Sequence, residues 1–404
     1  MVFEYSVVSS SLIYLLNIIM VFFIIFGYAF LKKKDPEHKI SVKWVRMYSA
    51  TYMKELLVFF LFFLLIASYL HMEWRLLDSD VFLAINGAVE SFLTGHNPYI
   101  DPVVPHRETG SNIIRWGVYN YLPLDLVLYS IGYLIFGSIS PQYWIFWTNF
   151  LILVLTLPII FIGFPKYPKS GITLGYGMFS VIPMYDNAYL MIALLIIALV
   201  IHTRMKSNGK YPLVIFVLTI ATLTKMFVIV VLGGYILFIF PKKIKPLVIS
   251  GLLSLSTFLI TLLPFGINNV LKATIFFHSN LDLRGEYATN KGGLMAGFYH
   301  LGLNAQETLI LASIIFFGFL TIFILIKIEP LLKIALLTTI GLSFIPSCVT
   351  AFLFMPIAVV VFYALDTNFG PKFGLEFINN TGNDNNCYTG VRTGNLWLPN
   401  HRFF

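Results

Sequence analysis

The sequence predicts an all-α polytopic membrane protein, and three observations carry this prediction. The 404 residues are 58% hydrophobic and 11% charged, whereas a soluble globular protein carries about 25% charged residues. Apolar runs of roughly 17–25 residues, the length that crosses a bilayer as a helix, recur from end to end. Short clusters of Lys and Arg separate these runs. Backbone polar groups must be satisfied within lipid, and the alternation of barrel strands is absent, so we expect helical spans.

About eleven transmembrane helices account for the apolar runs. The first is expected near residues 7–31 and the second near residues 56–70. The others are expected near residues 142–163, 171–184, 188–202, 211–224, 227–240, 246–263, 307–327, 330–346 and 350–366. Residues 1–366 then form one transmembrane domain, and residues 367–404 form a polar C-terminal tail rich in Asn and Gly.

Basic residues orient the predicted spans. Sixteen of the 27 Lys and Arg residues fall in clusters that the spans place on one side, beginning with Lys32, Lys33 and Lys34. Cytoplasmic loops carry an excess of Lys and Arg, so this side is expected to be cytosolic. The net charge of +8 is then a topology signal, and no nucleic-acid partner is predicted. We expect an integral protein of the cell membrane.

Two long loops, residues 71–141 and 264–306, are expected on the extracytoplasmic side. In the first loop, apolar residues recur at helical spacing from Val81 to Phe92. This pattern predicts an amphipathic juxtamembrane helix on the membrane surface. Residues 124–136 are apolar but short, and we expect a second surface or re-entrant segment there rather than a crossing.

The first long loop has two carboxylates just before its predicted helix. Asp78 and Asp80 flank a serine at this position. As solvated acids, they would favour the positive N-terminal end of the helix dipole. Alternatively, partial burial at the membrane boundary would raise the pKa of a carboxylate enough for general-base catalysis. These residues alone leave both interpretations open.

Further polar residues are expected at the same face of the membrane. Asp186 and Asn187 fall between two spans with almost no loop, and Lys225 is a lone cation between two apolar runs. A turn exposed to water and a lysine that extends to the interface would explain them structurally. Ionisable groups at such places are otherwise costly unless they serve a function. They are therefore candidates for a site.

The second long loop carries residues suited to an anion. It contains His278, Asp282, Arg284 and Lys291. Guanidinium grips phosphate oxygens bidentately, so this pattern suggests phosphate recognition. The sequence has no Walker motif, zinc-type His/Cys spacing or nucleophile elbow, and we assign no metal site.

The order of these motifs resembles a family of membrane enzymes. The acid pair precedes Gly-His-Asn-Pro-Tyr at residues 95–99 and Tyr-Asn-Tyr-Leu-Pro-Leu at residues 119–124. This order is similar to polyprenyl-phosphate-mannose-dependent mannosyltransferases of the GT-C superfamily of integral-membrane glycosyltransferases, including GPI mannosyltransferase I and its bacterial and archaeal relatives. Thr-Lys-Met-Phe at residues 224–227 resembles their Thr-Lys-x-Tyr element, and Asp-Leu-Arg at residues 282–284 resembles an Asp-x-Arg in a later loop. Residues 100–116 form an additional stretch between the first two motifs.

The resemblance implies an inverting transfer of a hexose, with mannose first, from a polyprenyl-phosphate sugar to a lipid-linked or glycan acceptor. Asp80, with Asp78 as the second choice, would accept the proton of the acceptor hydroxyl. Lys225 and Arg284 would hold the donor phosphate. The remaining substrate-binding candidates are Tyr121, Asp186, Asn187, His278 and Asp282. No cofactor is required, although the paired acids leave a divalent cation open.

Two other classes of membrane protein remain as alternatives. A transporter or flippase of lipid-linked sugars predicts interrupted helices with charges near the midplane of the bilayer. A glycan ligase or polymerase predicts outer loops rich in Arg and His. The ionisable residues here are expected at one face and begin with an acid pair, which favours the transferase.

The predicted topology is tested by labelling. Cysteines introduced at Ser111 and at Ser207 should react with a membrane-impermeant thiol reagent from opposite sides, because the positive-inside asymmetry separates these positions. The measurement is labelling of intact cells against inverted vesicles. Labelling of both positions from the same side would contradict the topology.

Overall fold

The computed structural model describes residue 19 and residues 80–107, 114–163, 187–241, 243–276, 298 and 301–344. Most of the predicted first span lies outside these residues, as do the predicted spans near residues 56–70, 171–184 and 350–366 and the tail 367–404.

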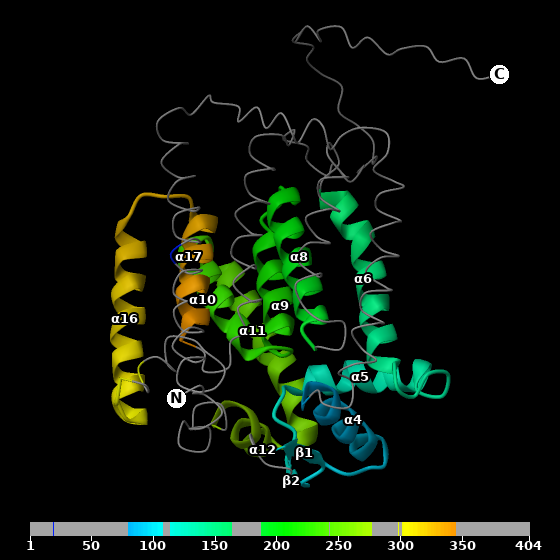
Figure 1. Cartoon of the computed structure of the whole chain (residues 1–404). Coiled ribbons are helices and arrows are strands. Elements are labelled where there is room, and N and C mark those ends of the chain that lie inside the picture. The colour runs from blue at the N-terminus through cyan, green and yellow to red at the C-terminus, as the bar shows by residue number, and fades with distance from the viewer. Residues whose placement is uncertain are drawn as a thin grey trace, which may run out of the picture.

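The body of the molecule is a bundle of apolar helices that stand side by side (Figure 1). They occur where the sequence predicts spans, as α6 (Trp144–Gly163), α8 (Tyr189–Arg204), α9 (Lys210–Thr222), α10 (Ile229–Phe238), α11 (Ile244–Leu262), α16 (Ala305–Leu325) and α17 (Pro330–Ser343). Helix α8 packs against α6 and α9, and α9 also contacts α10 and α11. Helix α10 packs against α17, which contacts α16. The described fold therefore agrees with the helical class predicted from composition.

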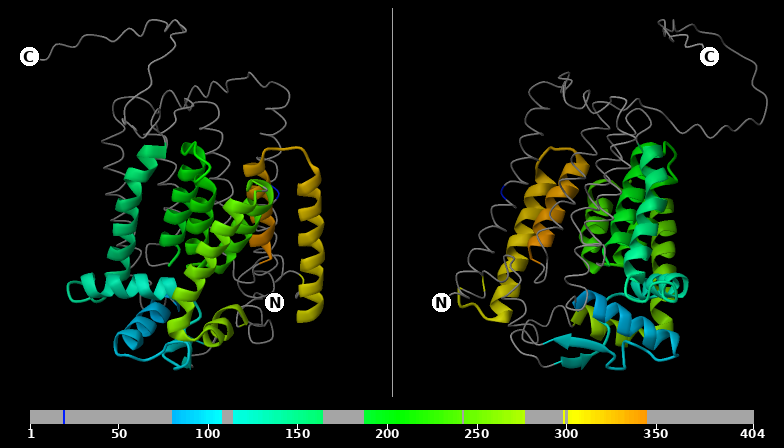
Figure 2. Two further views of the ribbon diagram at one scale, coloured as in Figure 1. Left: turned by 180° about the vertical axis from the view of Figure 1, so that it is seen from behind. Right: turned by 45° about the vertical axis from the view of Figure 1, so that its right-hand side comes forward.

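A second layer of short elements covers one end of the bundle, and the views agree on its place (Figures 1 and 2). Its elements are α4 (Asp80–Leu93), β1 (Val104–Arg107), β2 (Ile114–Gly117), α5 (Pro123–Phe136), η3 (Leu263–Phe265), α12 (Ile267–Leu271) and the π-helical turn η4 (Lys272–Phe276). Helix α5 lies across the end of the upright helices (Figure 1). Elements of both predicted long loops thus meet at the same end.

Helices form in this layer at the two positions where the sequence predicts surface segments. Helix α4 matches the amphipathic pattern from Val81 to Phe92, with Ile85, Ala88 and Val89 wholly buried on its inner face. Helix α5 begins at a proline in its first turn, where the fixed φ suits a helix start and no N–H is needed. Both helices run along the end of the bundle instead of continuing it.

The layer also contains a short β-ribbon that the all-α prediction does not include. Strands β1 and β2 pair antiparallel, from Val104 opposite Gly117 to Arg107 opposite Ile114. The ribbon occupies the additional stretch that separates the two sequence motifs. Each strand has only four residues, which is too short for a clear alternation of apolar and polar side chains.

One core joins the layer to the bundle. The large side chains of Leu126 and Tyr129 from α5 and Trp144 from α6 are 0% exposed and pack with the buried face of α4. The Tyr129 hydroxyl donates a hydrogen bond to Asn149 Oδ1 at 2.7 Å. Burial of each large apolar side chain contributes about 1.5–3 kcal/mol, so α4 and α5 are firmly held on α6.

Two of the described helices are long and apolar enough to cross a membrane. They span Ile244–Phe265, with 22 residues, and Gln306–Leu325, with 20 residues. Their outer faces present large apolar side chains such as Ile260, Phe317 and Leu325. Exposure of such surface to water costs about 25 cal/mol per Å², whereas a lipid environment removes this cost. Among the other described helices of the bundle, α8, α9, α10 and α17 are shorter.

The contact between α5 and α6 depends on a glycine and is tested by a matched pair of variants. A Cβ at Gly132 would lie 2.7 Å from Thr148 Cγ2. Thr148 cannot easily turn away, because its hydroxyl donates to the Trp144 carbonyl at 2.8 Å. Gly132→Ala should therefore lower the free energy of unfolding by about 1–3 kcal/mol through overpacking.

The control is Gly318→Ala in α16, where an added Cβ meets nothing within 4 Å. Alanine has the higher helix propensity, so this variant should be neutral or more stable by up to about 1 kcal/mol. Thermal unfolding of the two variants in the same detergent measures the difference. Equal stability of both variants would contradict the close contact at Gly132.

Candidate functional site

A chain of polar side chains links three segments where the layer of short elements meets the bundle. Asp125 lies in the first turn of α5, Asn187 lies two residues before α8, and Lys225 lies between α9 and the 3₁₀ turn η2 (Met226–Val228). The Asn187 Nδ2 group donates a hydrogen bond to Asp125 Oδ2. The Lys225 Nζ group donates one to Asn187 Oδ1. A carboxylate is thereby connected to an ammonium group through one amide.

Burial makes this connection energetically important. The side chains of Asp125 and Asn187 are 0% exposed, and Lys225 is half-buried. An isolated buried charge is costly, but a hydrogen-bonded partner of opposite charge offsets much of that cost. The N-terminal position of Asp125 in α5 adds a favourable interaction with the helix dipole.

A break between two helices brings Lys225 to this place. Helix α9 ends at Thr222, and the Lys225 backbone is extended, with φ −136° and ψ 115°. The backbone N–H groups of Thr224 and Lys225 both donate to the Ala221 carbonyl at 3.1 Å. They close the end of α9, and the extended residue then directs the chain into η2.

The lysine also contacts an aromatic ring. Its Nζ atom lies 4.7 Å from the centroid of the Tyr121 ring, a distance typical of a cation–π interaction. Tyr121 belongs to the Tyr-x-Tyr motif, so the predicted motif and the lone lysine are in contact. Three predicted site residues, Tyr121, Asn187 and Lys225, are brought together here.

An aromatic cluster surrounds this part of the site. The rings of Tyr99 and Tyr121 each contact the Tyr119 ring, with centroids 5.6 Å and 5.5 Å away. The Tyr99 hydroxyl donates to the Tyr121 carbonyl at 2.8 Å. Burial, followed by the negative charge of Asp125, raises the pKa of both Tyr99 and Tyr119 well above the usual value for tyrosine. Their hydroxyls therefore remain protonated donors at physiological pH.

The Gly-His-Asn-Pro-Tyr motif joins the two long loops. Gly95, with φ +87°, ends α4 in the left-handed conformation that glycine adopts without strain. The Asn97 Oδ1 atom accepts from the Tyr99 N–H at 3.0 Å, and Asn97 Nδ2 donates to the Phe265 carbonyl at 3.0 Å. The Tyr99 and Phe265 rings also pack with centroids 5.3 Å apart. The motif is therefore a structural clamp between α4 and η3.

Asp125 is the site residue that the sequence analysis did not single out. It directly follows the Tyr-Asn-Tyr-Leu-Pro-Leu motif and is the only charged residue of α5. A lone carboxylate in the first turn of an apolar segment was the available signal, because such a group needs a partner when it is buried.

The other predicted site residues have different outcomes. Asp80 is the first residue of α4. Asp78, Asp186, His278, Asp282 and Arg284 lie outside the described residues. Within the described ranges, no group of three or more His, Cys, Asp or Glu residues is arranged to hold a metal ion.

Comparison with known proteins gives no significant match to a protein-family model, a curated protein or a solved structure.

The role of Asp125 in stability is testable. Asp125→Leu removes the acceptor of the Asn187 amide and leaves the Lys225 charge without its opposite charge. Leaving the buried Asn187 amide without its acceptor costs about 1–3 kcal/mol. Asp101→Leu is the matched control, because the Asp101 side chain is 43% exposed, lies 3.8 Å from His96 Nδ1 and accepts a hydrogen bond from the Asn97 N–H at 3.2 Å.

An exposed pair of this kind contributes about 0–1 kcal/mol. Thermal or urea unfolding in detergent should therefore separate the two variants clearly. A loss at Asp125 no larger than the loss at Asp101 would show that the buried polar chain does not stabilise the fold.

Proposed function

We propose that the protein is an inverting membrane hexosyltransferase with about eleven transmembrane helices. It would transfer a hexose, with mannose as the first candidate, from a polyprenyl-phosphate sugar to a lipid-linked or glycan acceptor at the extracytoplasmic face. The observation that carries the proposal is the convergence of Lys225, Asn187 and Tyr121 at the end of the bundle where elements of both long loops gather.

Lys225 is suited to the phosphate of the donor. An ammonium group is a compact charge that binds phosphate. Asn187 and Tyr121 hold the ammonium group of Lys225 in one place. A hydrophobic donor tail would remain in the bilayer beside the helices while its phosphate reaches the lysine at the end of the bundle. Arg284, in the second long loop, is proposed as a second cation for the same phosphate.

Asp80 is the proposed general base. It begins α4, the juxtamembrane helix that packs on α5 and β1. Its carboxylate would take the proton from the acceptor hydroxyl as the oxygen of that hydroxyl forms a bond to the anomeric carbon. The bond from the anomeric carbon to the phosphate oxygen breaks at the same time, and its electron pair stays with the phosphate. Such a base contributes about 10²–10⁴ to the rate.

The distribution of charge favours an enzyme over a transporter. A transporter predicts ionisable groups near the midplane of the bundle. The charged residues of the described site, Asp125 in α5 and Lys225 after α9, lie instead where the layer meets the end of the bundle. This place suits a reaction at the membrane surface, where the lipid-linked donor meets an acceptor in water.

The test is transfer by the purified full chain in nanodiscs. It is incubated with a panel of radiolabelled polyprenyl-phosphate sugars and with extracted lipids, and the labelled product is counted. Asp80→Asn should reduce turnover at least about 100-fold, because the acceptor proton loses its base. Near-normal turnover of this variant would refute the assignment of the base, and absence of transfer from every donor in the wild-type protein would refute the proposed function.

The cation is tested in the same assay. Lys225→Gln should lower kcat by about 10²–10³, the cost typical of losing one group that stabilises a developing negative charge. The matched control is Lys210→Gln at the other end of α9. Lys210 also lies near a tyrosine ring, 5.2 Å from the Tyr211 centroid, and donates to a carbonyl. An equal effect of both variants would indicate a loss of folding instead of a loss of phosphate binding.

A further inference from the structure

A groove of about 520 Å³ runs along the outer face of α4 and the turn that follows it. The residues that give it chemical character are Asn86, Glu90, Ser91, Thr94 and His96, with Leu83 at its start. The groove is shallow and open. The groove belongs to neither the buried polar chain nor the aromatic cluster described above.

A carboxylate in this groove is held by a buried side chain. Trp144, which is 0% exposed, donates from Nε1 to Asn86 Oδ1 at 3.0 Å. This bond orients the Asn86 amide so that its Nδ2 group donates to Glu90 Oε1 at 2.9 Å. Glu90 itself is exposed. The bond to Asn86 thereby fixes one oxygen of the Glu90 carboxylate. The exposed carboxylate is available to bind an external partner.

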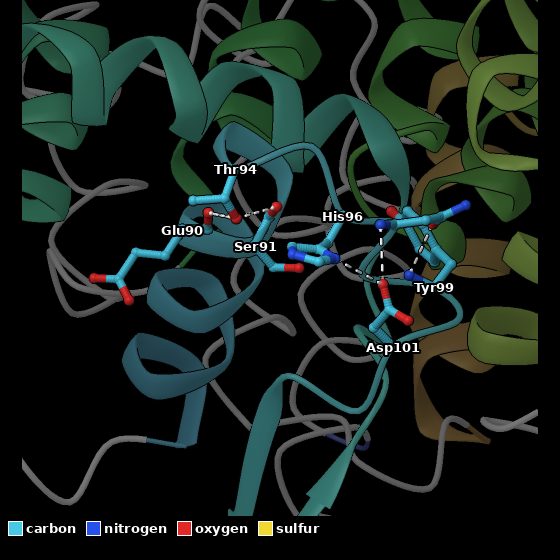
Figure 3. A network of polar contacts seen from close by, with 7 residues as sticks. Glu90, Ser91, Thr94, His96, Tyr99 and Asp101 are labelled. Carbon is cyan, nitrogen blue, oxygen red and sulfur yellow. Dashed lines mark hydrogen bonds and ion pairs between the residues drawn. The ribbon is translucent and has the colours of Figure 1, made fainter.

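The other end of the groove supplies an imidazole group beside a buried hydroxyl. Figure 3 shows Ser91 and His96 on the opposite side of α4 from the Glu90 carboxylate, with Asp101 beyond His96. The Ser91 side chain is 7% exposed, and its buried hydroxyl has no hydrogen-bond partner. The imidazole of His96 lies 3.8 Å from Asp101 Oδ2. The His96 imidazole therefore lies on one side of α4, and the Glu90 carboxylate lies on the other.

The lining selects a class of ligand. It contains neither Lys nor Arg among the described residues, so it does not suit a phosphate. Carboxylate, amide, hydroxyl and imidazole groups together match the donors and acceptors of a neutral ligand that carries many hydroxyls. Apolar residues such as Leu83 and Val103 complete the lining and suit the C–H face of a sugar ring. A carbohydrate meets all of these conditions.

Helical periodicity relates the groove to the start of α4. Positions 80, 83, 87, 90 and 94 fall on one face of the helix, because they follow the spacing of three and four residues per turn. Position 80 lies about 15 Å along the helix axis from position 90 at a rise of about 1.5 Å per residue. A glycan in the groove would therefore extend toward the first turn of α4.

We propose that this groove is the acceptor site and that it binds the carbohydrate of the acceptor along α4. This inference rests on the proposed function. The bound glycan presents one hydroxyl at the start of the helix, where Asp80 takes its proton while the oxygen attacks the anomeric carbon of the donor. Glu90, held by Asn86, positions the glycan by hydrogen bonding to its hydroxyls and takes no part in the bond changes.

Binding is tested on the full chain in phosphatidylcholine nanodiscs without turnover. The probe is octyl α-mannoside that carries a diazirine, and cross-linked peptides are mapped by mass spectrometry. Labelling should concentrate in residues 83–103 and should fall at least fivefold in Glu90→Gln, a variant that keeps an oxygen for Asn86. Glu307→Gln is the control, because glutamine preserves the capping box at the start of α16.

Competition distinguishes a sugar site from a site for the alkyl chain. Excess methyl α-mannoside should abolish labelling if the sugar is recognised, whereas competition by octanol alone would overturn the proposal. If mannobiose, a soluble glycan, competes as well as octyl mannoside does, the acceptor need not be lipid-linked. Stronger competition by octyl mannoside indicates a lipid-linked acceptor.

Kinetics then distinguish failure of the groove from failure of the function. Glu90→Gln should raise the KM for the acceptor at least fivefold and leave the KM for the polyprenyl-phosphate donor unchanged. Wild-type turnover with no labelling of residues 83–103 and no change in acceptor KM would overturn the groove as the acceptor site. Labelling of the groove without turnover on any donor would retain a carbohydrate site and refute the transferase.

Discussion

The contact between α5 and the bundle depends on the partners of one buried carboxylate, that of Asp125. Asp125 is wholly buried in the first turn of α5, and such a group is tolerated only where hydrogen bonds and an opposite charge replace water. Asn187 and Lys225 supply both. Because these residues precede α8 and follow α9, the same contacts tie the start of α5 to the bundle. Helix α4 packs on α5 in turn.

The end of the bundle is built from two kinds of contact with separate consequences. Aromatic packing and the bond from Asn97 to the Phe265 carbonyl hold the two long-loop segments together. The polar chain holds a cation at a defined place beside Tyr121. On the outer face of α4, a third arrangement, from Trp144 through Asn86 to Glu90, positions a carboxylate in a groove. The lysine and the groove are thus separate features of this end of the molecule, because no residue of the polar chain lines the groove.

Much of the fold was predictable because hydropathy acts on each segment by itself. An apolar run such as residues 307–327 forms a helix in lipid whatever its neighbours are, and α16 was predicted almost to the residue. The surface helices α4 and α5 were also predictable, because amphipathic spacing and insufficient length are properties of the local sequence. The ribbon of β1 and β2 was not, since its strands are short and β1 also contacts α4, which lies apart from it in the sequence. The Gly-His-Asn-Pro-Tyr motif was identified, but its role as a clamp was not.

The sequence by itself predicted the helical architecture, including two helices long and apolar enough to cross a membrane, and it identified three members of the candidate site, Tyr121, Asn187 and Lys225. Each of these stood out because it is polar or belongs to a motif within an apolar chain. Only the tertiary structure decided that they meet, and that Asp125 is their buried partner. The bond from Asn187 to Asp125 joins residues 62 positions apart, and the bond from Lys225 to Asn187 joins residues 38 positions apart. Contacts at such separations depend on how whole helices pack, which local pattern does not encode.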